Sequence, residues 1–353
     1  MQTAPSAAPA AASNSLFHAI PTILNSFKTI ENKLMPTPRT TVFRDGTATL
    51  MRFENAAGEH GKGAAVLLVP SMINKWYVMD LRPGASMIDA LVAQGLDVFC
   101  IDWGEPQAED RYLSWDDVQE RLARLMRATR RIAGRTQIGV LGYCMGATLC
   151  AVAVARKPQG VSALINLAGP IDFSHSGVLG EMTDARWFDG DALAAAGNIT
   201  TAQMQSGFTS MRPTLQIGKW IGLIDRADDV LAVDAFAAME TWANDNVPFP
   251  AAAYATYIRE LYQGNLLVAG KHVACGQRIR LSDITCPTMV ICAAKDAICP
   301  PPAATALTDL CGSAIKKVVT VPGGHVGAVI GSRASRELYP AIGSFFAEHV
   351  PVV

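Results

Sequence analysis

The sequence has little net charge and no long apolar run, and these absences exclude several functions. The 353 residues carry a formal net charge of −1, and 17% of them are charged. A near-neutral chain offers no electrostatic attraction for nucleic acid or for an anionic membrane surface. No run of about eighteen apolar residues occurs, so we expect no membrane-spanning helix. An internal repeat is also absent.

The cysteine pattern lacks the features of a metal-binding or disulfide-rich protein. The eight cysteines show no paired spacing of the kind that binds zinc. The chain is also far too long to depend on disulfide bonds for its stability. We therefore expect reduced, mostly buried thiols in a cytoplasmic enzyme, with no metal site and no bound cofactor.

The first fourteen residues lack the features of a signal peptide. They are rich in Ala, Ser and Pro and contain neither Lys nor Arg. They have neither the positive start nor the apolar centre of a secretory leader. We predict that residues 1–14 form a disordered tail and that the chain stays in the cytoplasm.

The most informative feature that is present is the segment Leu141–Ala147, which reads LGYCMGA. Its Gly142-x-Cys144-x-Gly146 pattern matches a nucleophile elbow, a sharp strand-to-helix turn, with a thiol in place of the usual serine. The glycines let backbone segments pack closely because they lack a Cβ atom. An apolar run typical of a buried strand precedes the elbow, and a small-residue run typical of a helix follows it. A nucleophilic role is favoured over the alternative of a buried structural cysteine.

Short apolar runs alternate with helical segments along the chain, which predicts an α/β fold with a mostly parallel central sheet and helices on both faces. The expected core strands are residues 64–69, 96–101, 137–141, 161–167, 288–293 and 316–321. The expected helices are residues 15–36, 87–94 and 115–133. A hairpin is expected around Asp45-Gly46. Active sites in such sheets lie at the carboxyl ends of the strands.

The strand pattern stops between about Asp172 and Ile284, where the composition favours helices. Because this stretch is inserted between two core strands, we predict that it caps the active site. The expected division is a core of residues 15–171 and 285–353 and a cap of residues 172–284. Some aromatic residues of the cap are candidates to line an acyl channel, although ordinary helix packing is the favoured interpretation: Trp242, Tyr254, Tyr257 and Tyr262.

A nucleophilic thiol needs a base, and the base needs an orienting acid. In hydrolase-type sheets the order along the chain is nucleophile, acid, histidine. Asp296 and His325 fit this order because each follows a late predicted strand, as none of the other five histidines does. The alternatives are a turn residue for Asp296 and a surface-turn histidine for His325. Asp102 also ends a strand but precedes Cys144, so it is the weaker candidate for the acid.

Backbone N–H groups are expected to stabilise the oxyanion that forms during acyl transfer. One belongs to Met145, the residue after the nucleophile. The other comes from the loop after the 64–69 strand, at Ser71 or Met72. An acyl group on a cysteine stays activated as a thioester, so transfer to a hydroxyl group is favoured over hydrolysis.

Several segments together resemble the polyhydroxyalkanoate synthases, above all the short class III catalytic subunit. These segments are Val69–Leu81, Leu141–Ala147, Trp242–Asp245, Tyr257–Tyr262 and the loops that carry Asp296 and His325. The resemblance implies an α/β-hydrolase core with an inserted, mainly helical cap and a catalytic triad of Cys144, Asp296 and His325. Ala147 departs from the family pattern, which usually has a glycine there. Ser71 and Met72 also depart from it, since Pro and Trp are usual at these positions.

The resemblance also implies a reaction, polymerisation of (R)-3-hydroxyacyl-CoA with release of CoA, and 3-hydroxybutyryl-CoA is the expected substrate. The growing polyester chain is the second partner. A homodimer, a class III companion subunit and a location at polyester granules are further expectations. The alternative is an acyl-CoA thioesterase or a polyester or ester hydrolase on the same scaffold. A catalytically silent granule-binding protein is a third interpretation, which the complete triad disfavours.

Overall fold

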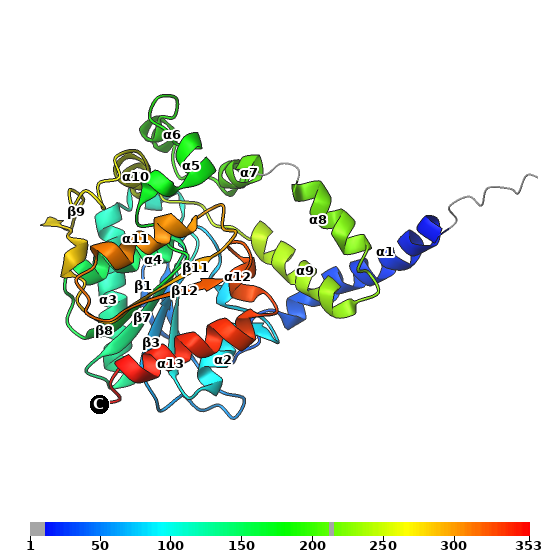
Figure 1. The fold of residues 1–353 in the computed structure, drawn as a ribbon, viewed down its shortest axis with the longest axis horizontal. Coiled ribbons are helices and arrows are strands. Elements are labelled where there is room, and N and C mark those ends of the chain that lie inside the picture. Colours follow the sequence, from blue (N-terminus) through cyan, green and yellow to red (C-terminus); the bar gives the residue numbers. More distant parts are fainter. Residues whose placement is uncertain (1–10, 212–214) are drawn as a thin grey trace, which may run out of the picture.

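An eight-stranded sheet forms the centre of the computed structural model, which describes residues 11–211 and 215–353 (Figure 1). The strand order is β1-β2-β6-β3-β7-β8-β11-β12. The strands are β1 (Arg39–Asp45), β2 (Ala48–Phe53), β3 (Ala65–Val69), β6 (Asp97–Asp102), β7 (Ile138–Tyr143), β8 (Val161–Leu167), β11 (Thr288–Ala293) and β12 (Lys316–Val321). From β6 to β12 all neighbours are parallel, whereas β2 is antiparallel to β1 and β6. The predicted mostly parallel sheet is confirmed.

The hairpin predicted near the start of the sheet is also confirmed. β1 and β2 pair from Arg39 opposite Phe53 to Asp45 opposite Ala48. Gly46 lies in the turn at a φ of 60°, a left-handed conformation that glycine adopts without steric cost. The turn therefore sets the register of the two antiparallel strands.

Helices cover both faces of the sheet, which explains why the central strands β3, β7 and β11 are buried throughout and apolar without alternation. Successive side chains point to opposite faces, so Val66 and Leu68 join one hydrophobic core and Leu67 joins the other. The helices on the Leu67 face are α3 (Trp115–Ala133), α4 (Met145–Ala155) and α11 (Pro301–Leu310). Those on the opposite face are α2 (Met87–Ala93) and α13 (Tyr339–His349).

Helix α3 begins and ends where the sequence predicts. The Ser114 side chain accepts a hydrogen bond from the Asp117 N–H, and the Asp117 carboxylate accepts one from the Ser114 N–H. Gly134 ends the helix at a φ of 65°. Such a cap stabilises a helix by about 1 kcal/mol.

The chain between β8 and β11 is mainly helical, as predicted. Its helices are α5 (Gly177–Met182), α6 (Gly190–Ala195), α7 (Thr201–Met211), α8 (Leu215–Ile224), α9 (Val230–Asn244) and α10 (Ala251–Thr256), with a π-helical turn at Tyr257–Gln263. A two-stranded ribbon follows, β9 (Val273–Ala274) and β10 (Gln277–Arg278). Ile199, Phe249 and Tyr257 of this region share one hydrophobic core with α3 and α4. The packing of this region is continuous with that of the core, so it does not mark where a cap begins or ends. The division into a core of residues 15–171 and 285–353 and a cap of residues 172–284 remains a prediction.

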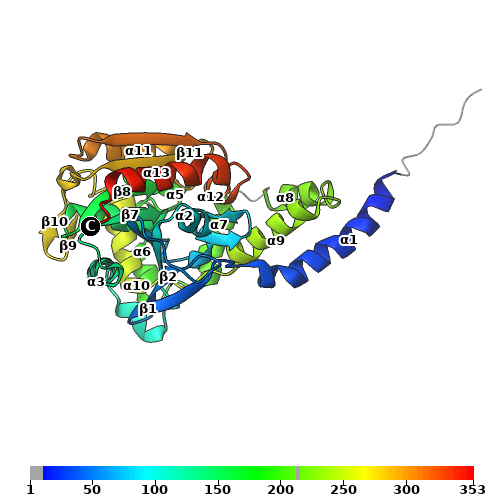
Figure 2. The same ribbon diagram turned by 90° about the horizontal axis from the view of Figure 1, so that it is seen from below.

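Three helices extend together away from the sheet, α1 (Ala11–Thr29), α8 and α9 (Figures 1 and 2). Phe27 of α1 stacks on Trp220 of α8 and meets Phe236 of α9 edge to face. Residues 1–10 of the predicted tail lie outside the described residues. The helix begins at Ala11 rather than at residue 15, and it ends at Thr29, so both predicted ends of this helix are wrong.

Further short elements include β4 (Asp80–Arg82), β5 (Ala85–Ser86), α12 (Gly327–Ile330) and a π-helical turn at Ala334–Leu338. Among the described residues, no helix combines the length and the apolar character needed to cross a membrane.

Candidate active site

Cys144 occupies the turn between β7 and α4 in a strained backbone conformation. Its φ of 56° and ψ of −130° lie in a region that residues with a Cβ atom rarely adopt, at a cost of about 1–3 kcal/mol. Two backbone hydrogen bonds hold the turn. The Cys144 N–H donates to the Leu167 carbonyl at 3.0 Å, and the Cys144 carbonyl accepts from the Ala147 N–H at 2.9 Å. The turn has the shape expected of a nucleophile elbow.

The two glycines of the motif allow this turn to form. A Cβ atom on Gly142 would lie 2.3 Å from the Cα atom of Ala147. A Cβ atom on Gly146 would lie 2.1 Å from the Val69 carbonyl oxygen. Both distances are far below van der Waals contact, so these positions require glycine. The start of α4 is thereby pressed against the carboxyl end of β3.

Asp296 and His325, predicted as acid and base, are hydrogen bonded. Asp296 Oδ2 lies 2.7 Å from His325 Nδ1. Asp296 Oδ1 accepts from the N–H groups of Ile298 at 2.8 Å and Cys299 at 2.9 Å. The carboxylate is completely buried and held by these bonds. Because it accepts from Nδ1–H, the second ring nitrogen, Nε2, is left for the nucleophile.

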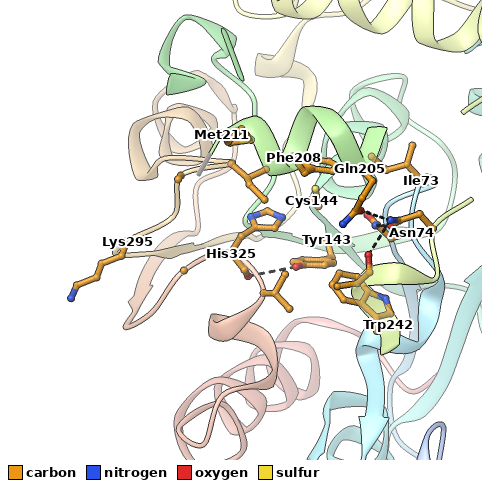
Figure 3. Close-up of a pocket in the computed structure, with 16 residues that line it drawn as sticks. Ile73, Asn74, Tyr143, Cys144, Gln205, Phe208, Met211, Trp242, Lys295 and His325 are labelled. Carbon is orange, nitrogen blue, oxygen red and sulfur yellow. Dashed lines mark hydrogen bonds between the residues drawn. The ribbon is translucent and has the colours of Figure 1, made fainter. Parts of the chain in front are cut away.

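His325 lies in the same cavity as Cys144 (Figure 3). Its ring stacks on Tyr143, with centroids 5.3 Å apart, and its Nε2 is buried without a hydrogen-bond partner among the described residues. Burial lowers the pKa of His325, but the neighbouring Cys144 and the hydrogen bond with Asp296 outweigh burial and raise this pKa to about 10. The imidazole therefore carries a positive charge at neutral pH, which is the arrangement that stabilises a reactive thiolate.

The residues expected to donate to the oxyanion lie in α4 and in the loop that packs against its start. Met145 is the first residue of α4, so its N–H has no carbonyl partner within the helix. Ser71 and Met72 are buried in the loop after β3. The contact between Gly146 and the end of β3 brings this loop to the turn. The choice between Ser71 and Met72 stays a prediction.

The cavity above Cys144 has a volume of about 310 Å³ and walls from two regions of the chain. Tyr143 and His325 lie on its core side, and Phe208 and Trp242 lie on its helical side (Figure 3). The lining is mostly apolar, as expected of a site for an acyl chain.

A second, apolar cavity of about 200 Å³ lies beside the first and shares Ile73 and Phe208 with it. The tyrosines considered for an acyl channel, Tyr254, Tyr257 and Tyr262, line this second cavity. They also pack on one another and on Phe249 and Phe173. Trp242 lines the first cavity instead.

Three side-chain amides in the wall of the first cavity were missed by the sequence reasoning: Asn74, Gln205 and Asn246. Asn74 lies in the segment that resembles the synthases, and Asn246 directly follows another such segment. The resemblance could therefore have identified Asn74 and Asn246 as candidate residues of the site. Gln205 carried no signal, because an isolated glutamine in a helix is common on protein surfaces.

Two family models match the sequence. The model of the α/β-hydrolase fold covers residues 64–331. The model of the poly-beta-hydroxybutyrate polymerase (PhaC) N-terminus covers residues 15–91. The two matches together span most of the chain and include the elbow and both loops of the proposed triad.

Several curated relatives share one name, poly(3-hydroxyalkanoate) polymerase subunit PhaC. The chain is 31% identical to the poly(3-hydroxyalkanoate) polymerase subunit PhaC of Allochromatium vinosum, over 88% of each chain. It is 30% identical to the protein of the same name from Synechocystis, over 88% of this chain and 85% of the relative. It is also 30% identical to the Haloferax mediterranei protein of that name, of whose length the match covers 64%.

Solved structures resemble the fold alone. A monoglyceride lipase from Saccharomyces cerevisiae aligns with a TM-score of 0.55 at 14% identity, over 89% of this chain and 97% of the lipase. The non-heme bromoperoxidase BpoC from Mycobacterium tuberculosis aligns with a TM-score of 0.54 at 15% identity, over 88% of this chain and 97% of that protein. Both likenesses support the α/β-hydrolase architecture.

Proposed function

Because the chain belongs to the poly(3-hydroxyalkanoate) polymerase family of α/β hydrolases, we propose that it polymerises (R)-3-hydroxyacyl-CoA, with 3-hydroxybutyryl-CoA as its substrate. The observation that carries this proposal is Cys144, held in a strained elbow beside the charged His325. A thiol that shares its proton with an imidazole is suited to attack a thioester.

In the first step His325 holds the proton of Cys144, and the Cys144 sulfur attacks the thioester carbonyl of the substrate. The Met145 N–H and one N–H of the loop after β3 stabilise the oxyanion. The bond to the CoA sulfur then breaks, and the His325 imidazolium gives its proton to that sulfur. The products are a Cys144 acyl thioester and free CoA, while Asp296 keeps the imidazole oriented.

In the second step the hydroxyl of a growing polyester chain attacks the Cys144 thioester. Neutral His325 takes the hydroxyl proton, a new ester bond forms, and the carbon–sulfur bond to Cys144 breaks. The electron pair stays on the sulfur, so the thiolate and the imidazolium are restored together. Replacing a thioester by an ester releases free energy, so the direction of transfer is favourable.

Partners are part of the proposal. The relatives are named polymerase subunits, which supports the proposal of a class III companion subunit. A homodimer and a location at polyester granules in the cytoplasm belong to the same proposal.

The direct test incubates the purified chain with 3-hydroxybutyryl-CoA, alone and with a class III companion subunit. We expect release of CoA together with a water-insoluble polyester. Cys144→Ala should abolish both, whereas Cys286→Ala, a matched change at a cysteine away from the cavity, should retain both. Release of CoA with free 3-hydroxy acid as the sole product would favour the alternative, a thioesterase or hydrolase.

A second experiment tests the base. His325→Gln keeps a polar side chain but cannot hold a positive charge. We expect acylation of Cys144 by 3-hydroxybutyryl-CoA, measured by intact-protein mass spectrometry, to slow by at least about a hundredfold. Acylation at the parental rate would show that another group acts as the base.

A further inference from the structure

A chain of three side-chain amides crosses the wall of the cavity above Cys144 (Figure 3). Asn74 comes from the loop after β3, Gln205 from α7, and Asn246 from the segment after α9. Asn74 Nδ2 donates to Asn246 Oδ1 at 2.5 Å, and Asn246 Nδ2 donates to Gln205 Oε1 at 2.8 Å. The sheet side and the helical side of the cavity therefore meet at these amides.

One backbone carbonyl decides the direction of every bond in this chain. Asn246 Nδ2 also donates to the Ala243 carbonyl at 3.0 Å, and a carbonyl can only accept. The Asn246 oxygen must therefore face Asn74, which presents its nitrogen. Gln205 must present its oxygen to Asn246. Asn74 Oδ1 and Gln205 Nε2 are then the two amide atoms of this chain that have no protein partner among the described residues.

The two free groups complement a hydroxyl, which donates one hydrogen bond and accepts others. Their two residues are joined through the single amide of Asn246 and line the same cavity as Cys144. The surrounding wall is mostly apolar, with Phe208 and Trp242 beside them. A ligand that fills this cavity displaces water from both amide atoms, so a ligand without a matching polar group leaves them unpaired at a cost in binding free energy. An acyl chain without a hydroxyl would leave both groups unpaired.

The described side chains around the amides add no charge that would bind a hydroxyl group in their place. The three amides are neutral, so they add no net charge beside Cys144 and His325. Lys295 also contributes to the lining of the cavity, but its side chain points away from the cavity (Figure 3).

We propose that Asn74 Oδ1 and Gln205 Nε2 bind the 3-hydroxyl of the acyl unit that is transferred to Cys144. The inference rests on the proposed function and adds to it the groups that select hydroxyacyl over plain acyl thioesters. Asn74 and Gln205 are specificity residues that contact the substrate. Asn246 is a positioning residue that orients both.

The test compares two substrates that differ only in this hydroxyl, (R)-3-hydroxybutyryl-CoA and butyryl-CoA. The rate at which each first acylates Cys144 is measured by rapid quench and intact-protein mass spectrometry. We expect the wild type to prefer the hydroxylated substrate by about tenfold or more. Gln205→Met and Asn74→Ala should each bring the ratio of rates close to one by slowing only the hydroxylated substrate. Gln159→Met, the same change at an exposed residue that lines neither cavity, should leave the ratio at its wild-type value.

The ratio separates recognition from general damage, because a loosened cap slows both substrates alike. Equal slowing of both substrates in Gln205→Met and Asn74→Ala would overturn the inference, and so would a wild-type ratio near one. In either case the proposed function would stand. A wild-type protein that 3-hydroxybutyryl-CoA does not acylate at all would overturn the proposed function, and the inference with it.

Discussion

At the scale of single residues, the imidazole of His325 is charged because of its neighbours. Burial alone would lower its pKa, and the contributions of Cys144 and Asp296 reverse this effect. Asp296 is in turn held by two backbone N–H groups. The reactivity of the site is therefore a property of the group rather than of any one side chain.

The first prediction concerns this charge. His325 should keep its proton through neutral pH, because its pKa is raised to about 10. Cys144→Ala removes the neighbouring sulfur that contributes most to the rise, so the pKa of His325 should fall. Nitrogen-15 NMR of the histidine side chains from about pH 6 to about pH 10 measures both proteins. An unchanged pKa in the variant would refute the pairing with Cys144, and the exposed His175 serves as an internal reference.

A second residue-scale feature explains how Ala147 fits after the elbow. A Cβ atom on Gly169 would lie 2.1 Å from the Cβ of Ala147 and 2.9 Å from the Cys144 carbonyl oxygen. The extra methyl at position 147 is therefore tolerated because residue 169 is a glycine.

Gly169→Ala should consequently destabilise the protein, by about 1–3 kcal/mol of unfolding free energy. Ala147→Gly in the same chain should recover part of the loss, since it removes the closest of these contacts. Urea unfolding of the two single variants and the double variant gives the coupling energy. Strictly additive effects would mean that the two residues do not compete for this space.

At the scale of elements, a buried histidine joins helix α3 to the π-helical turn Tyr257–Gln263. His272 is completely buried, and its Nε2 accepts a hydrogen bond from Trp115 Nε1 at 3.1 Å. Its Nδ1 therefore carries the proton and donates to Glu260 Oε2 at 2.8 Å. The Trp115 and Tyr257 rings stack beside it, with centroids 5.6 Å apart. A second proton on His272 would face the Trp115 N–H and break the first bond.

Stability should therefore fall in acid through His272. Burial lowers the pKa of His272 in the folded state below its ordinary value of 6.5, against the opposing charges of Glu260 and Asp116. Below about pH 6.5 His272 therefore binds a proton in the unfolded chain but not in the folded protein, and the free energy of unfolding decreases as the pH falls. His325 has the opposite effect above about pH 6.5, where the folded protein keeps a proton that the unfolded chain loses, and it adds little slope below that pH.

Urea midpoints at about pH 6.5 and about pH 5 measure this loss. His272→Gln should lower stability at the higher pH but reduce the difference between the two midpoints. His175→Gln, at an exposed histidine, should leave the wild-type difference. If His272→Gln retains the full difference, another group is responsible.

At the scale of the whole molecule, hydrogen bonds join the helical region to the core directly beside the cavity above Cys144. Tyr77 donates its hydroxyl to Asp245 at 2.9 Å, and Trp242 Nε1 donates to the Lys75 carbonyl at 2.8 Å. The backbones of Asn74 and Asn246 pair in an isolated antiparallel β-bridge next to these contacts. The shape of the cavity thus depends on how firmly these two parts are joined.

Tyr77→Phe should loosen this junction without disturbing the sheet. The variant removes one hydrogen bond to a carboxylate, and we expect a loss of about 1–2 kcal/mol of unfolding free energy. Hydrogen exchange should rise at the end of α9 and in the following residues, while β3 and β7 keep their protection. Tyr112→Phe, at an exposed tyrosine, is the matched control. Unchanged exchange near Asp245 would contradict the role of this contact.

The sequence by itself determined the fold class and the order of the proposed catalytic residues. Alternating apolar runs predicted the parallel sheet, because strands buried on both faces must be apolar throughout. The glycines around Cys144 indicated the elbow, since only a backbone without Cβ atoms can crowd there. Asp296 and His325 were predictable because the carboxyl ends of parallel strands meet at one edge.

Only the tertiary structure decided which distant groups meet. The pairing of Ala147 with Gly169, the bonds of His272 and the amides of Asn74, Gln205 and Asn246 join segments far apart in sequence. No local pattern encodes such contacts, because a side chain's hydrogen-bond partner depends on how whole elements pack. The ends of α1 were mispredicted because its local sequence does not mark where the helix begins, and the chain continues after Thr29 as a 3₁₀ turn, Ile30–Lys33.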